Sequence, residues 1–122
     1  AGGEVPYTSY IAKRSWLSDN EDLAKGFLRA VLKGVKYAQT EDANTVAEHL
    51  VGHFPSTSVQ SLATSVTSYR NIDGWVTDMA MTEASFNRLQ DIIESAGELD
   101  RRADFGALVD NSFVKEVYAQ LS

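Results

Sequence analysis

Two histidines come nearest to a catalytic or metal-binding pattern in this chain. His49 and His53 are four positions apart, and on one helix this spacing lets two imidazoles face the same metal ion. The residues between them read Leu-Val-Gly, so the glutamate that serves metalloproteases as a general base is missing. No third ligand is recognisable. We therefore predict an exposed pair on a polar helix face and no metal site.

Acidic residues and serines give no better pattern for catalysis. Glu41 with Asp42 would stand at a helix start, and Glu98 with Asp100 would stand in a loop, where carboxylates are usually solvated charges. No serine lies in a Gly-x-Ser-x-Gly motif, and no glycine-rich phosphate loop is present. The chain contains no cysteine, which removes thiolate nucleophiles, cysteine zinc sites and disulfides. We predict a protein that is not an enzyme and has no cofactor.

Tyr7, Thr8 and Tyr10 are the predicted ligand-binding residues. They belong to a short β-branched and aromatic run that follows Pro6, and a strand that leaves a linker with hydroxyls and a ring is suited to line a cleft. The alternative is a strand that simply packs in a sheet. Trp75 is expected to pack between helices, and Arg101 with Arg102 to form a solvated loop, although either could also contact a ligand.

Composition limits the classes of partner. The chain has 122 residues, 43% of them hydrophobic, which suits one domain. Its net charge of -6 argues against nucleic acid or an anionic membrane surface as the main partner. No run approaches the roughly 20 apolar residues of a membrane span. Ala1–Glu4 lacks the character of a signal peptide, and we expect a piece of a longer protein.

Apolar spacing and capping residues predict a mainly α chain with one N-terminal strand. The strand is expected at residues 7–12, and the region from 20 to 121 is expected to be helical. Pro55 and Gly97 should end helices, and Thr82 should begin one. The segment 71–81 carries the turn signal Asp73-Gly74 and is expected to be a connector. The five predicted helices cover residues 20–38, 41–54, 57–70, 82–96 and 111–121.

The order of these pieces resembles a known family along nearly the whole chain. The family is that of ABC-importer solute-binding proteins of the NitT/TauT and thiamin-pyrimidine-precursor type, and the likeness is to their carboxy-terminal portion. The residues that carry the resemblance are Pro6–Tyr10, Asp22–Ala30, Gly74-Trp75, Phe86–Ile93, Ala96–Leu99 and Leu108–Phe113.

The resemblance implies a function as well as a parent fold. Members form two α/β lobes with the ligand in the cleft, a type II periplasmic-binding-protein-like fold. This chain would then supply one strand and most helices of a lobe, with the upstream lobes missing. The implied role is to capture a small organic solute, such as a nitrate, sulfonate or taurine-type anion or a thiamin pyrimidine precursor, and to deliver it to the permease subunits. The implied location is periplasmic or extracytoplasmic, with a lipid anchor as one form.

Two other readings stay open at this point. A related branch of the same fold synthesises the thiamin pyrimidine enzymatically, but the histidine and cysteine-rich segment of that branch have no match here. The second open reading is a free-standing helical module that binds protein partners. A strand without neighbours leaves backbone groups unpaired, so we also expect the isolated chain to self-associate near residues 5–12.

Overall fold

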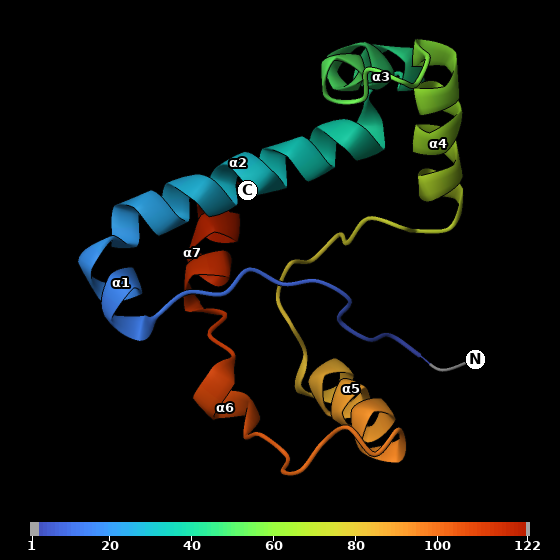
Figure 1. Ribbon diagram of the computed structural model, residues 1–122. Helices are drawn as coiled ribbons and strands as arrows, with labels where there is room; N and C mark the ends of the chain where they lie inside the picture. Colours follow the sequence, from blue (N-terminus) through green and yellow to red (C-terminus); the bar gives the residue numbers. More distant parts are fainter. Residues whose placement is uncertain (1–2, 122) are drawn as a thin grey trace. The chain divides into compact units, whose positions relative to one another are not determined.

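The computed structural model describes residues 3–121, and all of its regular secondary structure is helical (Figure 1). No β-strand occurs within these residues, so the prediction of a mainly α chain is confirmed. Ala1 and Gly2 of the predicted amino-terminal start lie outside the described residues, as does Ser122. The elements, in chain order, are α1 (Arg14–Asp19), α2 (Glu21–Thr40), α3 (Ala43–Leu50), the 3₁₀ turn η1 (Val51–His53), α4 (Val59–Asn71), α5 (Glu83–Ser95), α6 (Phe105–Leu108) and α7 (Ser112–Leu121).

The chain divides into two compact units. Unit 1 consists of Ala1–Gly26 and Ala80–Ser122, and unit 2 consists of Phe27–Met79. Helix α2 begins in unit 1 and continues into unit 2. Where chain length suggested one domain, the structure has two compact units.

Unit 2 is centred on a helical hairpin made by α3 and α4 (Figure 1). The hairpin has a small core, in which Ala47, Leu62 and Ala63 are buried. Asp42 begins α3 by accepting hydrogen bonds from the backbone N–H groups of Asn44 and Thr45 at 2.9 and 3.2 Å. Such a cap satisfies donors that a helix start otherwise leaves without partners.

In unit 1, helix α5 has well-defined ends. Thr82 accepts a hydrogen bond from the Ser85 N–H at 3.1 Å, which confirms the predicted cap. Gly97 has a φ of 75°, its N–H donates to the Glu94 carbonyl at 2.9 Å, and the Glu98 N–H donates to the Ile93 carbonyl at 3.1 Å. This pair of bonds is the Schellman arrangement, in which a left-handed glycine closes a helix.

Two side-chain amides of unit 1 make hydrogen bonds to backbone groups that a neighbouring strand could otherwise make. Buried Gln90 accepts from the Ala103 N–H at 2.6 Å and donates to the Ala103 carbonyl at 3.2 Å. Asn111 accepts from the Met81 N–H at 3.1 Å and donates to the Met81 carbonyl at 2.9 Å. Each amide copies the donor and acceptor of a peptide group, so each fixes a loop segment where sheet hydrogen bonding is absent.

The strand prediction for residues 7–12 is wrong in this structure. Residues 3–13 form neither a helix nor a strand, because a strand needs a neighbouring strand for its backbone groups and no strand occurs within residues 3–121. We call residues 4–13 the strap. Arg88 of α5 donates to the Glu4 carbonyl, and Arg14, at the other end, donates to the Ala107 carbonyl of α6.

The helix predictions are confirmed within two or three residues, with two omissions. Helices α1 and α6 were not predicted, because six and four residues are too short to show apolar periodicity. The predicted helix at 41–54 changes from α to 3₁₀ at Val51. The region 72–80 contains no helix, as expected for a connector.

The chain exposes more surface than its mass requires. Its accessible area is 8990 Å². We divide the mass of the chain in proportion to the two units. Two separate compact bodies of these masses would together have an accessible area of about 7800 Å². Large apolar side chains contribute to the excess, among them Tyr7, Ile11, Leu23, Ile72 and Leu108. No helix within residues 3–121 is long and apolar enough to cross a membrane.

Candidate functional site

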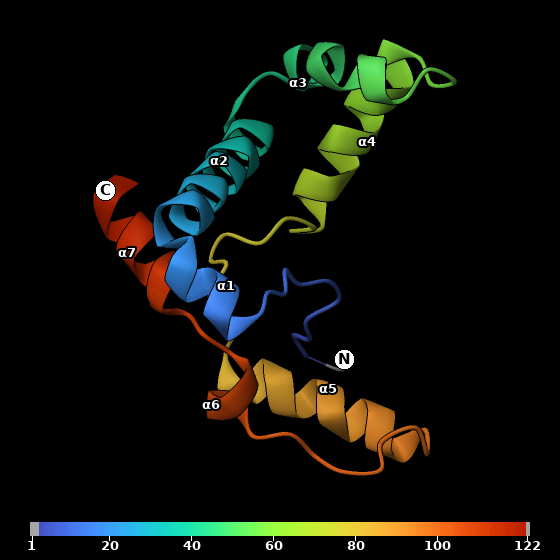
Figure 2. The ribbon, with the colours of Figure 1, turned by 60° about the vertical axis from the view of Figure 1, so that its left-hand side comes forward.

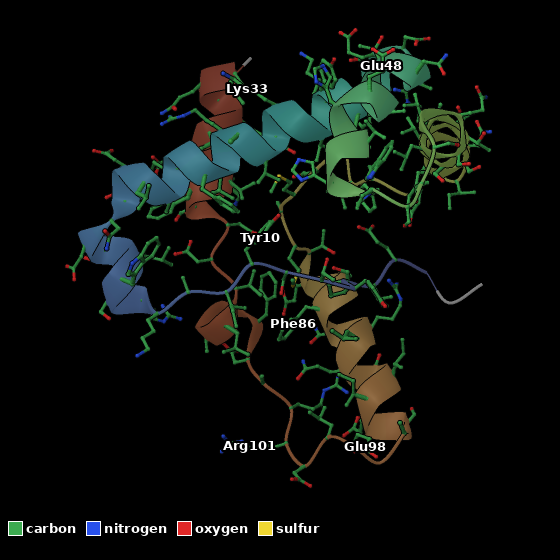
Figure 3. All side chains as sticks on the ribbon, turned by 45° about the horizontal axis from the view of Figure 1, so that its top comes forward. Tyr10, Lys33, Glu48, Phe86, Glu98 and Arg101 are labelled. Atoms are coloured by element: carbon green, nitrogen blue, oxygen red, sulfur yellow. The ribbon has the colours of Figure 1, made fainter. Side chains whose placement is uncertain are left out.

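The strap carries the three residues predicted to bind a ligand. Tyr7 is 98% exposed, Tyr10 is 67% exposed, and Thr8 is exposed as well. The two arginine bonds hold the strap at its ends, so its middle presents these side chains over the surface of unit 1. Figure 3 shows Tyr10 on this segment and Phe86 on α5.

An aromatic pair lies between the two helices that hold the strap. Phe86 of α5 and Phe105 of α6 pack edge to face, with ring centroids 5.6 Å apart and an interplanar angle of 65°. This geometry suits the ring quadrupoles and is worth about 0.5–1.5 kcal/mol beyond the burial of area. The strap is thus anchored on two helices that are themselves fixed to each other.

The histidine pair does not share one regular helix. His49 lies on α3 and His53 lies in the 3₁₀ turn, and both side chains are exposed. The change of helix type at Val51 alters the rotation per residue, so the four-residue spacing no longer implies a common face. The His49 ring packs edge to face on Tyr37, with centroids 5.6 Å apart. Within residues 3–121, no three His, Asp or Glu side chains are grouped as metal ligands would be.

Arg102 has a structural role on α5. Its Nη1 pairs with Asp91 at 2.7 Å and with Glu94 at 2.8 Å, and its Nη2 donates to the Asn87 carbonyl at 3.2 Å. The hydrogen bonds to Asp91 and then to Glu94 raise the pKa of Arg102. Arg101 beside it is exposed, and Figure 3 shows its side chain pointing away from Glu98. The arginine pair is therefore not a solvated loop as a whole, because Arg102 fastens that loop to the helix.

A lysine joins the beginning of α2 to α7 within unit 1. Lys25 pairs with Glu21 one turn earlier at 2.6 Å and with Glu116 of α7, and its Nζ lies 5.0 Å from the centre of the Phe113 ring. The hydrogen bonds to Glu116 and then to Glu21 raise the pKa of Lys25. Figure 2 shows α7 beside the first turns of α2. This cation holds two helices together, which is a structural function.

Trp75 lies in a hollow of unit 2, in the connector after α4. Its ring stacks on Tyr69 of α4, with centroids 5.5 Å apart and an interplanar angle of only 18°. The stack depends on Gly74, whose N–H donates to the Tyr69 carbonyl at 2.7 Å. Trp75 was expected to pack between helices, and the contact that its ring makes is with Tyr69 of α4. The hollow measures about 240 Å³ and is lined by Gln39, Tyr69, Arg70, Asp73, Trp75 and Thr77.

Arg70 connects this hollow to the end of α2. Its Nε donates to the Ala38 carbonyl at 2.8 Å, and its Nη2 donates to the Glu41 carbonyl. Carbonyls at a helix end have no partner within the helix and carry partial negative charge, so a guanidinium is well placed there. Asp73 has a φ of 49°, a turn conformation that Asp tolerates better than most residues. In the sequence, this hollow was indicated only by the turn signal Asp73-Gly74 followed by a tryptophan.

One comparison with known proteins gives a relative. The chain is 29% identical over 118 residues to "Putative binding protein YtlA" of Bacillus subtilis (strain 168), and the match covers 97% of this chain. The chain spans 35% of the length of that relative. No protein-family model matches the chain, and no solved structure matches it. The similarity supports a relationship to binding proteins and indicates nothing more specific than the words of that name.

Proposed function

We propose that residues 1–122 form part of an extracytoplasmic solute-binding protein that serves an ABC importer. The observation that carries this proposal is the similarity to the Bacillus subtilis binding protein, which extends over 97% of this chain. The relative is much longer, and this agrees with a chain that supplies only part of a two-lobed protein. The chain is not an enzyme in this proposal, and its partners are a small solute and the permease subunits.

The solute is of the NitT/TauT or thiamin-pyrimidine-precursor class, and the strap takes part in binding it. Support comes from the position of Tyr7, Thr8 and Tyr10 on a segment that is held at both ends and exposed between them. A segment that is held at both ends and carries polar side chains between them is a suitable wall for a ligand, because its ends are already placed before binding. The location is periplasmic or extracytoplasmic, with a lipid anchor where the natural protein carries one.

In the complete protein, we propose, the strap pairs with a strand from outside these 122 residues. Residues 7–12 have the composition of a strand, and a strand of this kind can add to the edge of a sheet. The chain exposes about 1000 Å² more surface than two compact units would. In this proposal, the part of the protein outside these 122 residues covers that surface. When the 122-residue chain is alone, a second copy supplies the partner, and the chain self-associates through its strap.

Light scattering on the purified chain tests the self-association. We expect a mass above that of the 13.4 kDa monomer, and we expect Ser9→Pro to return it to the monomer because proline removes a backbone donor. Ser9→Ala, which keeps the N–H group, is the matched control and should associate as the parent does. A monomeric parent, or association that survives Ser9→Pro, would show that the strap needs no partner strand.

The proposed function is tested by ligand binding to the longest natural polypeptide that contains these residues. Taurine, nitrate and a thiamin pyrimidine precursor are added separately while the melting temperature is recorded. A ligand that binds only the folded state raises that temperature by mass action. We expect one of the three to do so, and we expect Tyr7→Ala with Tyr10→Ala to reduce the effect. Conversely, hydrolysis or conversion of the bound solute by the protein would mean that the enzymatic reading is correct.

A further inference from the structure

We propose that the hollow beside Trp75 binds a small uncharged ring that carries hydroxyl groups, of the size of a single monosaccharide. The hollow lies entirely in unit 2 and shares no residue with the strap. It is therefore a second site, and it does not depend on the proposed function. The inference follows from three properties of the lining, namely its rings, its polar groups and its size.

The rings supply an apolar wall. Tyr69 and Trp75 are nearly parallel, and both line the hollow. Tyr69 is 50% exposed, so the pair is not enclosed in a core. The face of an aromatic ring is negative, and the C–H groups on one side of a sugar ring are slightly positive. A sugar ring can therefore lie flat on an aromatic side chain.

The polar groups of the lining suit hydroxyls rather than a charged group. Asp73 offers acceptor oxygens, Arg70 offers donors, and the amide of Gln39, whose Nε2 donates to the Trp75 carbonyl at 3.4 Å, has both kinds of group. Arg70 uses two of its five N–H groups on the carbonyls of α2, and these bonds fix its position. One negative and one positive side chain face the same hollow, so neither an anion nor a cation is favoured. A hydroxyl both donates and accepts, and it suits this mixture.

Size restricts the ligand further. At about 240 Å³, the hollow is smaller than the roughly 300–1,000 Å³ of sites for drug-sized molecules. One six-membered ring with its substituents is the appropriate scale. The hollow is open on one side, so we expect weak binding, with a midpoint of about 1–10 mM, the weak end of the affinity scale.

The test uses the fluorescence of Trp75 in the 122-residue chain. The chain has two tryptophans, and Trp16→Phe leaves Trp75 as the single reporter. Glucose, galactose and mannose are titrated separately, with the cation choline and the anion acetate as charged comparison ligands. We expect at least one sugar to give a saturable change in the millimolar range, and we expect neither charged compound to do so.

Variants identify the site. Asp73→Asn keeps the turn, because Asn also tolerates a positive φ, and Tyr69→Leu removes the stacking partner. Each should weaken binding at least tenfold, while Tyr37→Leu, which removes an aromatic ring of the same unit from outside the hollow, should leave the midpoint unchanged. Circular dichroism of each variant checks that helix content is preserved.

Three results would overturn the proposal. The first is the absence of any saturable change up to about 100 mM sugar, two powers of ten weaker than the stronger limit expected. The second is binding that Asp73→Asn and Tyr69→Leu both leave unaltered. The third is saturable binding of choline or acetate at the same concentrations, since this would show that the hollow selects charge. None of these results bears on solute binding by the strap.

Discussion

Replacement of Gly74 by alanine should disturb the Tyr69–Trp75 stack. A Cβ at this position would lie 2.6 Å from Cδ1 of Tyr69 and 3.1 Å from the Tyr69 carbonyl oxygen. The first distance is too short for any contact, so the phenol ring must move. The carbonyl oxygen belongs to the backbone of α4, which accepts the Gly74 N–H at 2.7 Å and has little freedom to shift.

The expected cost combines overpacking with loss of the stack. Inserting a methyl group into a tight contact costs about 1–3 kcal/mol, and an aromatic pair is worth about 0.5–1.5 kcal/mol. Because Tyr69 is half exposed and its ring can turn toward solvent, we expect the lower part of this range, about 1–2 kcal/mol. In urea this should lower the unfolding midpoint by about 1 M. Trp75 emission in the Trp16→Phe background should shift to the red, because the indole loses its cover.

Gly34 provides the matched control. It lies within α2, and a Cβ there would meet nothing within 4 Å. Gly34→Ala should therefore stabilise the helix by about 0.5–1 kcal/mol, the ordinary gain from replacing a glycine in a helix interior. Equal stability of Gly74→Ala and the parent, with unchanged Trp75 emission, would refute the reasoning. So would an equal loss of stability in both glycine variants, because the effect would then not come from the contact with Tyr69.

The remaining predictions concern unit 1. Gln90→Leu should lower the free energy of unfolding by about 1–3 kcal/mol, because the Ala103 N–H and carbonyl lose their partners in a partly buried position; urea unfolding measures this, and an unchanged midpoint would mean that water replaces the amide. The hydrogen bonds from Ser112 lower the pKa of Asp110 below its usual 3.8. The ionised carboxylate therefore stabilises the fold at pH values above 3.8. This contribution to stability is lost as the pH falls from 3.8 through the lower pKa of the folded state. Asp110→Asn should therefore be less stable than the parent at pH 7, and the difference should close below about pH 4; a gap that is the same at pH 3 and pH 7 would contradict this.

Much of the fold could be predicted because it depends on local chemistry. Thr82 and Gly97 bound α5 where their own hydrogen-bonding and backbone preferences place them, and Pro55 separates α3 from α4 as expected. Such signals act within one turn of helix and need no knowledge of the rest of the chain. Helices long enough to show a repeat of apolar residues were found for the same reason.

The strap and the hollow could not be predicted because they depend on distant residues. The run at Tyr7–Ala12 has the composition of a strand, yet whether a strand forms is decided by a partner and not by composition. The anchors of the strap, Arg88 and Arg14, act on carbonyls 84 and 93 positions away in the sequence. Likewise, Gln39 and Trp75 are 36 positions apart, and only the folded hairpin brings them to one hollow. Long-range polar contacts of this kind leave no periodic signal.

The central claim is that this chain belongs to a protein that captures a small solute with the help of the strap, and calorimetry on the longest natural polypeptide tests it most directly. Taurine, nitrate and a thiamin pyrimidine precursor are titrated into the parent and into a variant with Tyr7→Ala, Thr8→Ala and Tyr10→Ala. The account predicts saturable binding of one of these solutes to the parent at one site, and binding at least tenfold weaker to the variant. Binding of none of them to the folded parent, or equal binding to parent and variant, would contradict it.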